Sequence, residues 1–166
     1  MPKALAVRIT NISRALYVAL ALIVLLGDQG TKALVEHSIR EHAVIPVFPH
    51  FLNFVHNKNP GVAFGLFSDS PAPWKTALLV VASAALLAFV VVLVWKSKRL
   101  PWESSVGLAM ILGGALSNLI DRVRFGRVLD FIDVYVGSYH WPAFNLADSA
   151  IVVGAGFLIF HLLTSD

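Results

Sequence analysis

The stretch TALLVVASAALLAFVVVLVW, Thr76–Trp95, contains no charged residue and is bracketed by Lys75 and by the run Lys96, Lys98 and Arg99. At about 1.5 Å of rise per residue, a helix of about twenty apolar residues matches the roughly 30 Å hydrocarbon core of a bilayer. The stretch therefore predicts a transmembrane helix whose flanking cations lie at the level of the lipid headgroups.

The whole chain has the composition of a membrane protein. Of its 166 residues, 57% are hydrophobic and 14% are charged, and its mean hydropathy is +0.75. A soluble domain of this length needs a more polar surface. Because the apolar residues also lie in long blocks, the sequence predicts one membrane-embedded domain over residues 1–166, with no second domain.

Missing residue types and motifs exclude several classes of chemistry. The sequence has no cysteine, which excludes thiolate catalysis, disulfides and cysteine zinc sites. Its histidines form no HExxH motif and are interpreted as interface anchors, so no metal site is expected. The net charge of +3 comes from cations beside apolar blocks rather than from a basic stripe interleaved with aromatics, which argues against nucleic-acid binding.

Three further apolar blocks complete a predicted membrane all-α fold, a four-transmembrane-helix bundle with spans at about residues 13–35, 76–95, 104–121 and 143–163. The first block, Ala15–Gly27, resembles the apolar region of a signal peptide. No small-x-small cleavage site follows it, so we interpret it as a retained helix that continues to about Val35. The third block, Val106–Ile120, is rich in small residues, which let helices approach closely in lipid.

The two longer loops are predicted to share a small β-sheet. The strand-like runs Phe51–His56 and Val62–Phe67 flank a turn signal at Asn57–Gly61, and Val128–Val136 is a third run between spans three and four. In a four-span chain both loops lie on one side of the membrane. The cations of the short second loop favour cytoplasmic N- and C-termini, so the sheet is expected to be extracytoplasmic.

Polar residues converge on that same side of the predicted bundle. A charge at the centre of a spanning helix costs roughly 2.5–3.5 kcal/mol on insertion scales, so polar residues near such depths need a reason, and function is the first hypothesis. The end of the first span, the end of the third, the start of the fourth and the two long loops carry Asp28, Lys32, Asn59, Asn118, Asp121, Arg122, Asp130, Asp133, Asn145 and Asp148.

Several of these residues also have a purely structural interpretation. Asp28 and Lys32, at i and i+4, can form an ion pair that only supports the fold. Asn145 and Asp148, at i and i+3, can be no more than an N-terminal helix cap. The sequence pattern alone leaves both alternatives open.

Asp130 is harder to explain as a structural residue. It interrupts an apolar run, where an unpaired carboxylate is costly. Asp133 lies three residues further on, on the opposite strand face, and is expected to be solvated. The polar residues that end the third span can serve only to stop the helix at the headgroups, although Arg122 is also placed to hold Asp121 or a carboxylate of the facing loop.

Five motifs occur in register with the four spans. They are Asp28-Gln29-x-x-Lys32, Asn59-Pro60-Gly61-Val62-Ala63-Phe64, Gly114-Ala115-x-x-Asn118-x-x-Asp121-Arg122, Val128-x-Asp130-Phe131 and Phe144-Asn145-x-Ala147-Asp148. Together they resemble the bacterial lipoprotein signal peptidase family, also called signal peptidase II, over nearly the whole chain. The sequence departs from the family at Ser117, where glycine is usual, and we expect only slightly altered helix packing there.

The resemblance implies an aspartic endopeptidase of the bacterial inner membrane. Such an enzyme removes the signal peptide of a prolipoprotein by cleaving before a cysteine that carries a diacylglyceryl group, with its active site near the extracytoplasmic face. Asp130 and Asp148 match the catalytic pair, and no metal or organic cofactor is required. We expect a monomer whose partners are the lipid-modified prolipoprotein and membrane lipids. The positions that match substrate-binding or supporting residues are Asp28, Lys32, Asn59, Gly61, Asn118, Arg122 and Asn145.

Two other classes of function account for parts of the pattern. A small transporter or proton-relay protein would use Asp28, Lys32 and Asp148 as buried charges, but it predicts polar residues spread through the bilayer depth rather than gathered at one face. A non-catalytic assembly factor would use the small-residue third span as a partner surface. A Ser–Lys hydrolase has little support, because Lys32 has only Thr31 beside it.

Overall fold

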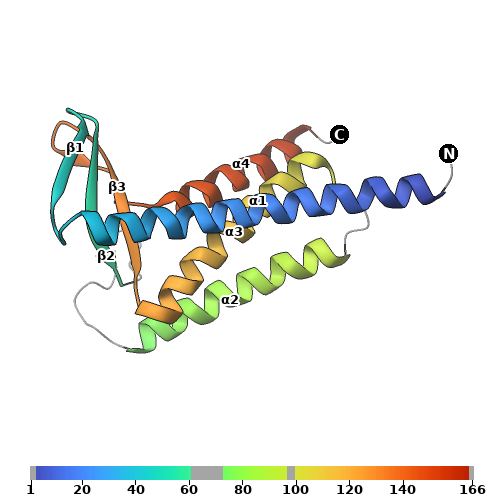
Figure 1. The fold of residues 1–166 in the computed structure, drawn as a ribbon, viewed down its shortest axis with the longest axis horizontal. Helices are drawn as coiled ribbons and strands as arrows, with labels where there is room; N and C mark the ends of the chain where they lie inside the picture. Colours follow the sequence, from blue (N-terminus) through green and yellow to red (C-terminus); the bar gives the residue numbers. More distant parts are fainter. Residues whose placement is uncertain (1–2, 61–72, 97–99, 165–166) are drawn as a thin grey trace.

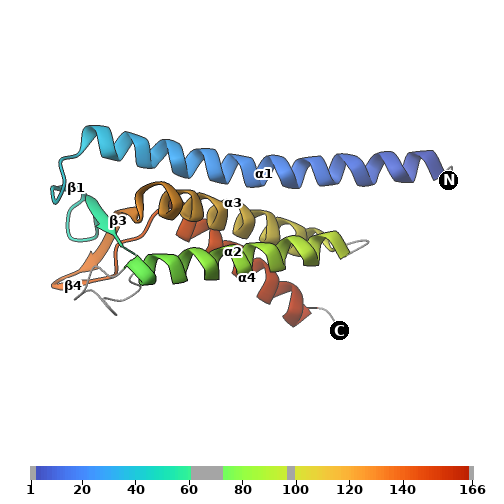
Figure 2. The same ribbon diagram turned by 90° about the horizontal axis from the view of Figure 1, so that it is seen from below.

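The computed structural model describes residues 3–60, 73–96 and 100–164, and over these residues four helices form a bundle with a sheet at one end (Figure 1). Both ends of the chain lie at the end of the bundle away from the sheet, as Figures 1 and 2 show. The helices are α1 (Lys3–Ser38), α2 (Pro73–Lys96), α3 (Trp102–Phe125) and α4 (Leu146–Thr164). The strands are β1 (Val44–Phe48), β2 (Leu52–Asn59), β3 (Val128–Val136) and β4 (Tyr139–His140).

Among the described residues, three helical segments are long and apolar enough to cross a membrane: Arg14–Ser38, Trp102–Phe125 and Leu146–Thr164. The described apolar part of α2 is shorter, Ala77–Val92. Large apolar side chains point outward from the bundle, with Val152 71% and Leu162 74% exposed. A lipid-facing surface explains this exposure, because a soluble protein would bury most such side chains.

Helix α4 begins at Leu146, whereas the sequence predicts a fourth span from about residue 143. Phe144 instead forms a β-bridge with Ile132 of β3, and its carbonyl oxygen accepts the N–H groups of Phe131 and Ile132. The chain is therefore extended up to Asn145, and the helix begins directly after this residue.

Helix α3 lies at the centre of the bundle and contacts α1, α2 and α4 (Figure 2). Its glycines allow very close approach to α4. A Cβ atom at Gly107 would lie 2.6 Å from the carbonyl oxygen of Gly154, and a Cβ at Gly154 would lie 2.6 Å from that of Gly107. In lipid, close packing of small residues drives helix association. The prediction that the small residues of Val106–Ile120 let helices approach closely is therefore confirmed.

The sheet has the order β1-β2-β3-β4 and is antiparallel throughout. Its strands come from the loop after α1 and the loop between α3 and α4, as predicted. Strand β1 was not predicted, and the predicted run Val62–Phe67 lies outside the described residues. Leu129 and Phe131 of β3 pack with Val35 of α1 in a buried apolar cluster, which fixes the sheet against the end of the bundle.

A tight turn links α3 to β3 and sets where the strand begins. Gly126 ends α3 in the left-handed conformation, with φ 68°, and donates its N–H to the carbonyl oxygen of Arg122 at 3.0 Å. Residues with a Cβ rarely adopt this conformation. Leu129 points toward α1. Because successive residues of a strand point to opposite faces, Asp130 points to the other face of β3.

Candidate active site

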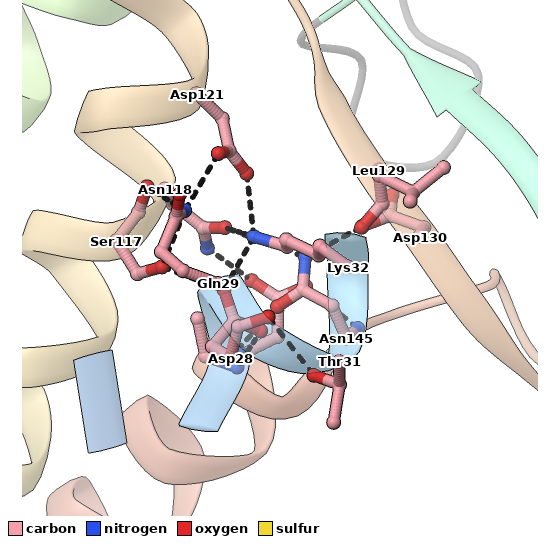
Figure 3. Close-up of polar contacts among 12 residues, drawn as sticks. Asp28, Gln29, Thr31, Lys32, Ser117, Asn118, Asp121, Leu129, Asp130 and Asn145 are labelled. Atoms are coloured by element: carbon pink, nitrogen blue, oxygen red, sulfur yellow. Dashed lines mark hydrogen bonds and ion pairs between the residues drawn. The ribbon is translucent and has the colours of Figure 1, made fainter. Parts of the chain in front are cut away.

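Lys32 is at the centre of a buried polar network, and Figure 3 shows its ammonium among acceptors from two helices. Its Nζ lies 2.6 Å from Asp28 Oδ2 and 2.6 Å from Asp121 Oδ2, and it donates to Asn118 Oδ1 at 2.9 Å. The predicted Asp28–Lys32 pair is therefore present, and a second carboxylate joins it. The buried ammonium of Lys32, placed between a carboxylate of α1 and a carboxylate of α3, holds these two helices together.

Asp28 also connects α1 to the first turn of α4. It is fully buried, and its Oδ1 accepts the backbone N–H of Ala147 at 2.8 Å. A carboxylate at this position satisfies a helix N–H that has no partner within α4 and interacts favourably with the helix dipole. Asp28 is thus a structural link, which is one of the two interpretations that the sequence left open.

Sequence reasoning did not identify Gln29 and Ser117 as members of the network. Ser117 is fully buried and donates to Asp28 Oδ2 at 2.7 Å. Gln29 Nε2 donates to Ser117 Oγ at 2.9 Å and to Asp121 Oδ1 at 2.7 Å. The serine at the family's glycine position therefore adds hydrogen bonds. A polar Gln29 in an apolar helix was the available signal.

Lys32 determines how the amide of Asn118 is oriented. An ammonium group can only donate, so the Asn118 atom that faces Lys32 must be the oxygen. The amide nitrogen then faces α4, where Asn118 Nδ2 donates to Asp148 Oδ1 at 2.8 Å. The buried lysine thereby directs a hydrogen-bond donor at Asp148 through one intervening side chain.

Asn145 has the same kind of fixed orientation, set by the helix it caps. Its Oδ1 accepts the backbone N–H of Asp148 at 2.9 Å, and Asp148 Oδ2 accepts the backbone N–H of Asn145 at 3.2 Å. This reciprocal pair is a capping box. With its oxygen committed to the cap, the amide nitrogen donates to Asp130 Oδ1 at 2.7 Å. Asn145 therefore caps α4 and contacts both aspartates.

Asp130 is 3% exposed and accepts a second hydrogen bond, from Asn59 Nδ2 to its Oδ2 at 2.9 Å. Burial raises the pKa of the Asp130 carboxyl to about 6, although the hydrogen bonds from Asn59 and Asn145 oppose this shift. The negative charge of Asp148 raises it further. Asp130 therefore retains a proton at a pH where an exposed aspartate is ionised.

Arg122 contacts neither Asp121 nor a loop carboxylate by a salt bridge among the described residues. Its Nη1 donates to the carbonyl oxygen of Asn118 at 3.2 Å, and its buried Nε has no hydrogen-bond partner there. Lys32 and Gln29 hold Asp121 instead. Gly61, the remaining predicted site residue, lies outside the described residues.

Two predictions in the sheet are wrong. Asp133 is not solvated, since it is only 8% exposed. The strand register places it opposite Asn53, whose Nδ2 donates to Asp133 Oδ2 at 2.8 Å, and His140 Nδ1 lies 2.8 Å from Asp133 Oδ1. His56 is not an interface anchor, since it is 3% exposed and its Nδ1 lies 2.6 Å from the carbonyl oxygen of Ile39. Asp133 connects β3 to β2 and β4, and His56 connects β2 to the residue that follows α1. Both lie outside the Asp130–Asp148 cluster.

Two buried or half-buried aspartates around one asparagine can share a proton and act as an acid–base pair on a water molecule. Together with long apolar helices, this arrangement defines a class, the membrane-embedded aspartic peptidases. Comparison with known sequences specifies the family: the chain matches the model described as "Signal peptidase (SPase) II" over residues 20–164, and it belongs to that family. Its activity is that of an aspartic peptidase that removes signal peptides from prolipoproteins.

Individual relatives are similar along most of the chain. A lipoprotein signal peptidase of Solibacter usitatus is 46% identical over 136 residues, covering 82% of this chain and 83% of the relative. One of Desulforapulum autotrophicum is 46% identical over 145 residues, covering 85% and 87%. A bacterial membrane enzyme solved by the in meso method at 2.3 Å resolution has 32% identity and a TM-score of 0.80, covering 90% of this chain and 88% of that one. A second such structure, at 1.9 Å, has 29% identity and a TM-score of 0.81, covering 92% and 95%.

Proposed function

We propose that Asp130 and Asp148 are the catalytic pair of this peptidase. The observation that supports this most is the shared contact with Asn145, which donates its side-chain amide to Asp130 and its backbone N–H to Asp148. Asn59 and Asn118 supply one further donor to each carboxylate. Four donated hydrogen bonds hold the two groups in place without supplying an opposite charge to either one.

The proposed reaction uses one ionised and one protonated aspartate. Donated hydrogen bonds favour ionisation, whereas burial and a neighbouring carboxylate oppose it, so the pair keeps one proton and titrates as a unit. The ionised member takes a proton from water, which attacks the scissile carbonyl carbon. The protonated member donates to the carbonyl oxygen and later helps the amine to leave. No step requires a metal or an organic cofactor.

Arg122 is proposed to hold the substrate backbone. Its Nη1 fixes the carbonyl oxygen of Asn118, and its Nε is a buried donor with no partner among the described residues. A peptide carbonyl oxygen is an acceptor of the right kind for this N–H. Lys32 and Asp28 are assigned a different role, since they orient Asn118 and the start of α4.

The proposed substrate is a prolipoprotein whose cysteine already carries a diacylglyceryl group, with cleavage directly before that cysteine. The assay uses the purified protein in detergent with matched precursors that do or do not carry the lipid. Cleavage of the lipid-modified precursor alone, at the bond before the cysteine, is expected. Equal cleavage of both precursors would overturn the substrate assignment and leave the peptidase activity standing.

We further propose four spans, a monomeric single domain, and cytoplasmic termini with the sheet on the extracytoplasmic side of a bacterial inner membrane. Because the chain has no cysteine, single cysteines report topology directly. Y139C, on the exposed β4, should react with a membrane-impermeant maleimide from outside intact cells. L163C, near the end of α4, should react only after permeabilisation. The reverse pattern would overturn the orientation.

A further inference from the structure

A cavity of about 440 Å³ lies between α1 and the corner where α3 turns into β3, and none of the preceding functions uses it. Gln29, Lys32 and Asp121 of the buried network form part of its lining, whereas Asp130 and Asp148 do not line it. Leu129 also lines it, and Asp130 points to the opposite face of the same strand. The cavity is therefore separate from the proposed catalytic pair.

The residues that line this cavity include more cations than carboxylates. Lys32, Lys58, Arg124 and Arg127 line it, against the carboxylates of Glu36 and Asp121. Lys32 is neutralised inside the network, and Lys58 pairs with Glu36 at 3.3 Å and with Glu41 at 2.8 Å. Among the described residues, no carboxylate forms a salt bridge with Arg124 or Arg127, and both are exposed. Two guanidinium groups are thus available to an anion.

The position of the cavity relative to the bilayer suggests where that anion comes from. The apolar span of α3 ends at Phe125, so Arg124 and Arg127 lie at the depth of the lipid headgroups. Ala33, Phe125 and Leu129 give the same cavity an apolar wall. A basic pocket between membrane helices with such a wall matches a phospholipid, because its phosphate is anionic and its chains are apolar.

We propose that this cavity binds the headgroup of an anionic phospholipid. The phosphate lies against Arg124 and Arg127, which can donate in the bidentate manner that phosphate oxygens accept. The start of an acyl chain lies along Phe125 and Ala33. A lipid held there would touch α1, α3 and β3 at once. It would therefore brace the end of the bundle beside the Lys32 network.

The test measures retention of phosphatidylglycerol and phosphatidylcholine by delipidated protein, using native mass spectrometry across a lipid titration. R124Q/R127Q should weaken phosphatidylglycerol binding by about tenfold or more and change phosphatidylcholine binding little, since each cation near anionic lipid contributes about 1 kcal/mol. R8Q/R14Q is the matched control, because it removes two cations from the other part of α1. It should leave binding unchanged.

A second variant separates the cavity from general surface charge. A33W keeps every cation but fills the cavity, and it should weaken phosphatidylglycerol binding while the thermal unfolding midpoint stays near that of the parent. Unchanged lipid binding in A33W, or an equal loss in the control variant, would overturn the proposal. Inorganic phosphate at matched concentration should not displace the lipid, and full displacement would mean that the site takes free phosphate instead.

Discussion

The side-chain amide of Asn145 donates to Asp130 Oδ1 at 2.7 Å. Its orientation is fixed, because the oxygen of the same amide accepts the N–H of Asp148 at the start of α4. Capping and site organisation are therefore not alternatives for this residue. One side chain begins the fourth helix and, in doing so, directs a donor at the carboxylate that β3 supplies.

Replacing Asn145 by serine should separate these two roles. Serine is a good N-cap and alanine is not, so N145S should be more stable than N145A by about 1 kcal/mol. Serine cannot donate to Asp130 across the same distance, and a lost hydrogen bond to a charged group costs about 1.5–3 kcal/mol. Cleavage by N145S should therefore fall roughly tenfold to a hundredfold. Thermal unfolding and initial rates measured on both variants check this, and full activity in N145S would leave only the capping role.

Glycine at position 154 should be needed for helix packing, whereas glycine at 156 should not. A Cβ at Gly154 would meet the Gly107 carbonyl oxygen at 2.6 Å, while a Cβ at Gly156 meets nothing within 4 Å. G154A should therefore lower the unfolding midpoint markedly. G156A should leave it unchanged or raise it, since alanine favours helix by up to about 1 kcal/mol over glycine. Equal effects of the two substitutions would contradict the packing of α3 on α4.

Removing Lys32 should destabilise the protein strongly. K32M leaves Asp28 and Asp121 buried without their cation, and breaking a buried pair in this way costs about 3–5 kcal/mol. K58M is the matched control, because Lys58 pairs with carboxylates that are about half exposed, and its loss should matter little.

The double variant K32M/D121N should recover part of the loss, since it removes one of the two uncompensated charges. Unfolding midpoints in one detergent at one pH provide the comparison. A K32M midpoint no lower than that of K58M would show that the network contributes nothing to stability.

The fold should lose stability as the pH rises through the titration of Asp130. Its pKa is raised from 3.8 to about 6 by burial, so the folded state binds this proton more tightly than the unfolded state. Its contribution is fully present below about pH 4 and is lost as the pH rises through about 6. The shift corresponds to roughly 3 kcal/mol. Between these pH values the unfolding midpoint of the parent should fall relative to that of D130N, and a constant difference would contradict the shifted pKa.

Regular features of the fold could be predicted because they follow from local patterns. Apolar block length indicated the helices, and the β-branched and aromatic residues of Val128–Val136 indicated β3. The i, i+4 spacing of Asp28 and Lys32 predicted their ion pair. Such features depend on residues close together in sequence, which is why one sequence was enough.

Other parts of the site depend on contacts between distant segments and could not be predicted. Asp133 was expected in water because it lies on the strand face opposite Asp130, yet the strand register brings Asn53 to it. Gln29 and Ser117 are 88 residues apart, and only the packing of α1 on α3 brings them together. Helix α4 begins a few residues after the predicted start of the fourth span for the same reason, because the backbone of Phe144 pairs with Ile132 of β3.

The assignment of Asp130 and Asp148 as the catalytic pair is tested most directly by the initial rate of cleavage of a lipid-modified precursor. D130N, D148N and the parent are compared with D133N, a control aspartate of the same strand that contacts Asn53 and His140 instead. D130N and D148N should each be slower by roughly 10²- to 10⁴-fold while remaining inserted and folded, and D133N should keep most of its activity. Turnover close to that of the parent in either D130N or D148N would contradict the assignment.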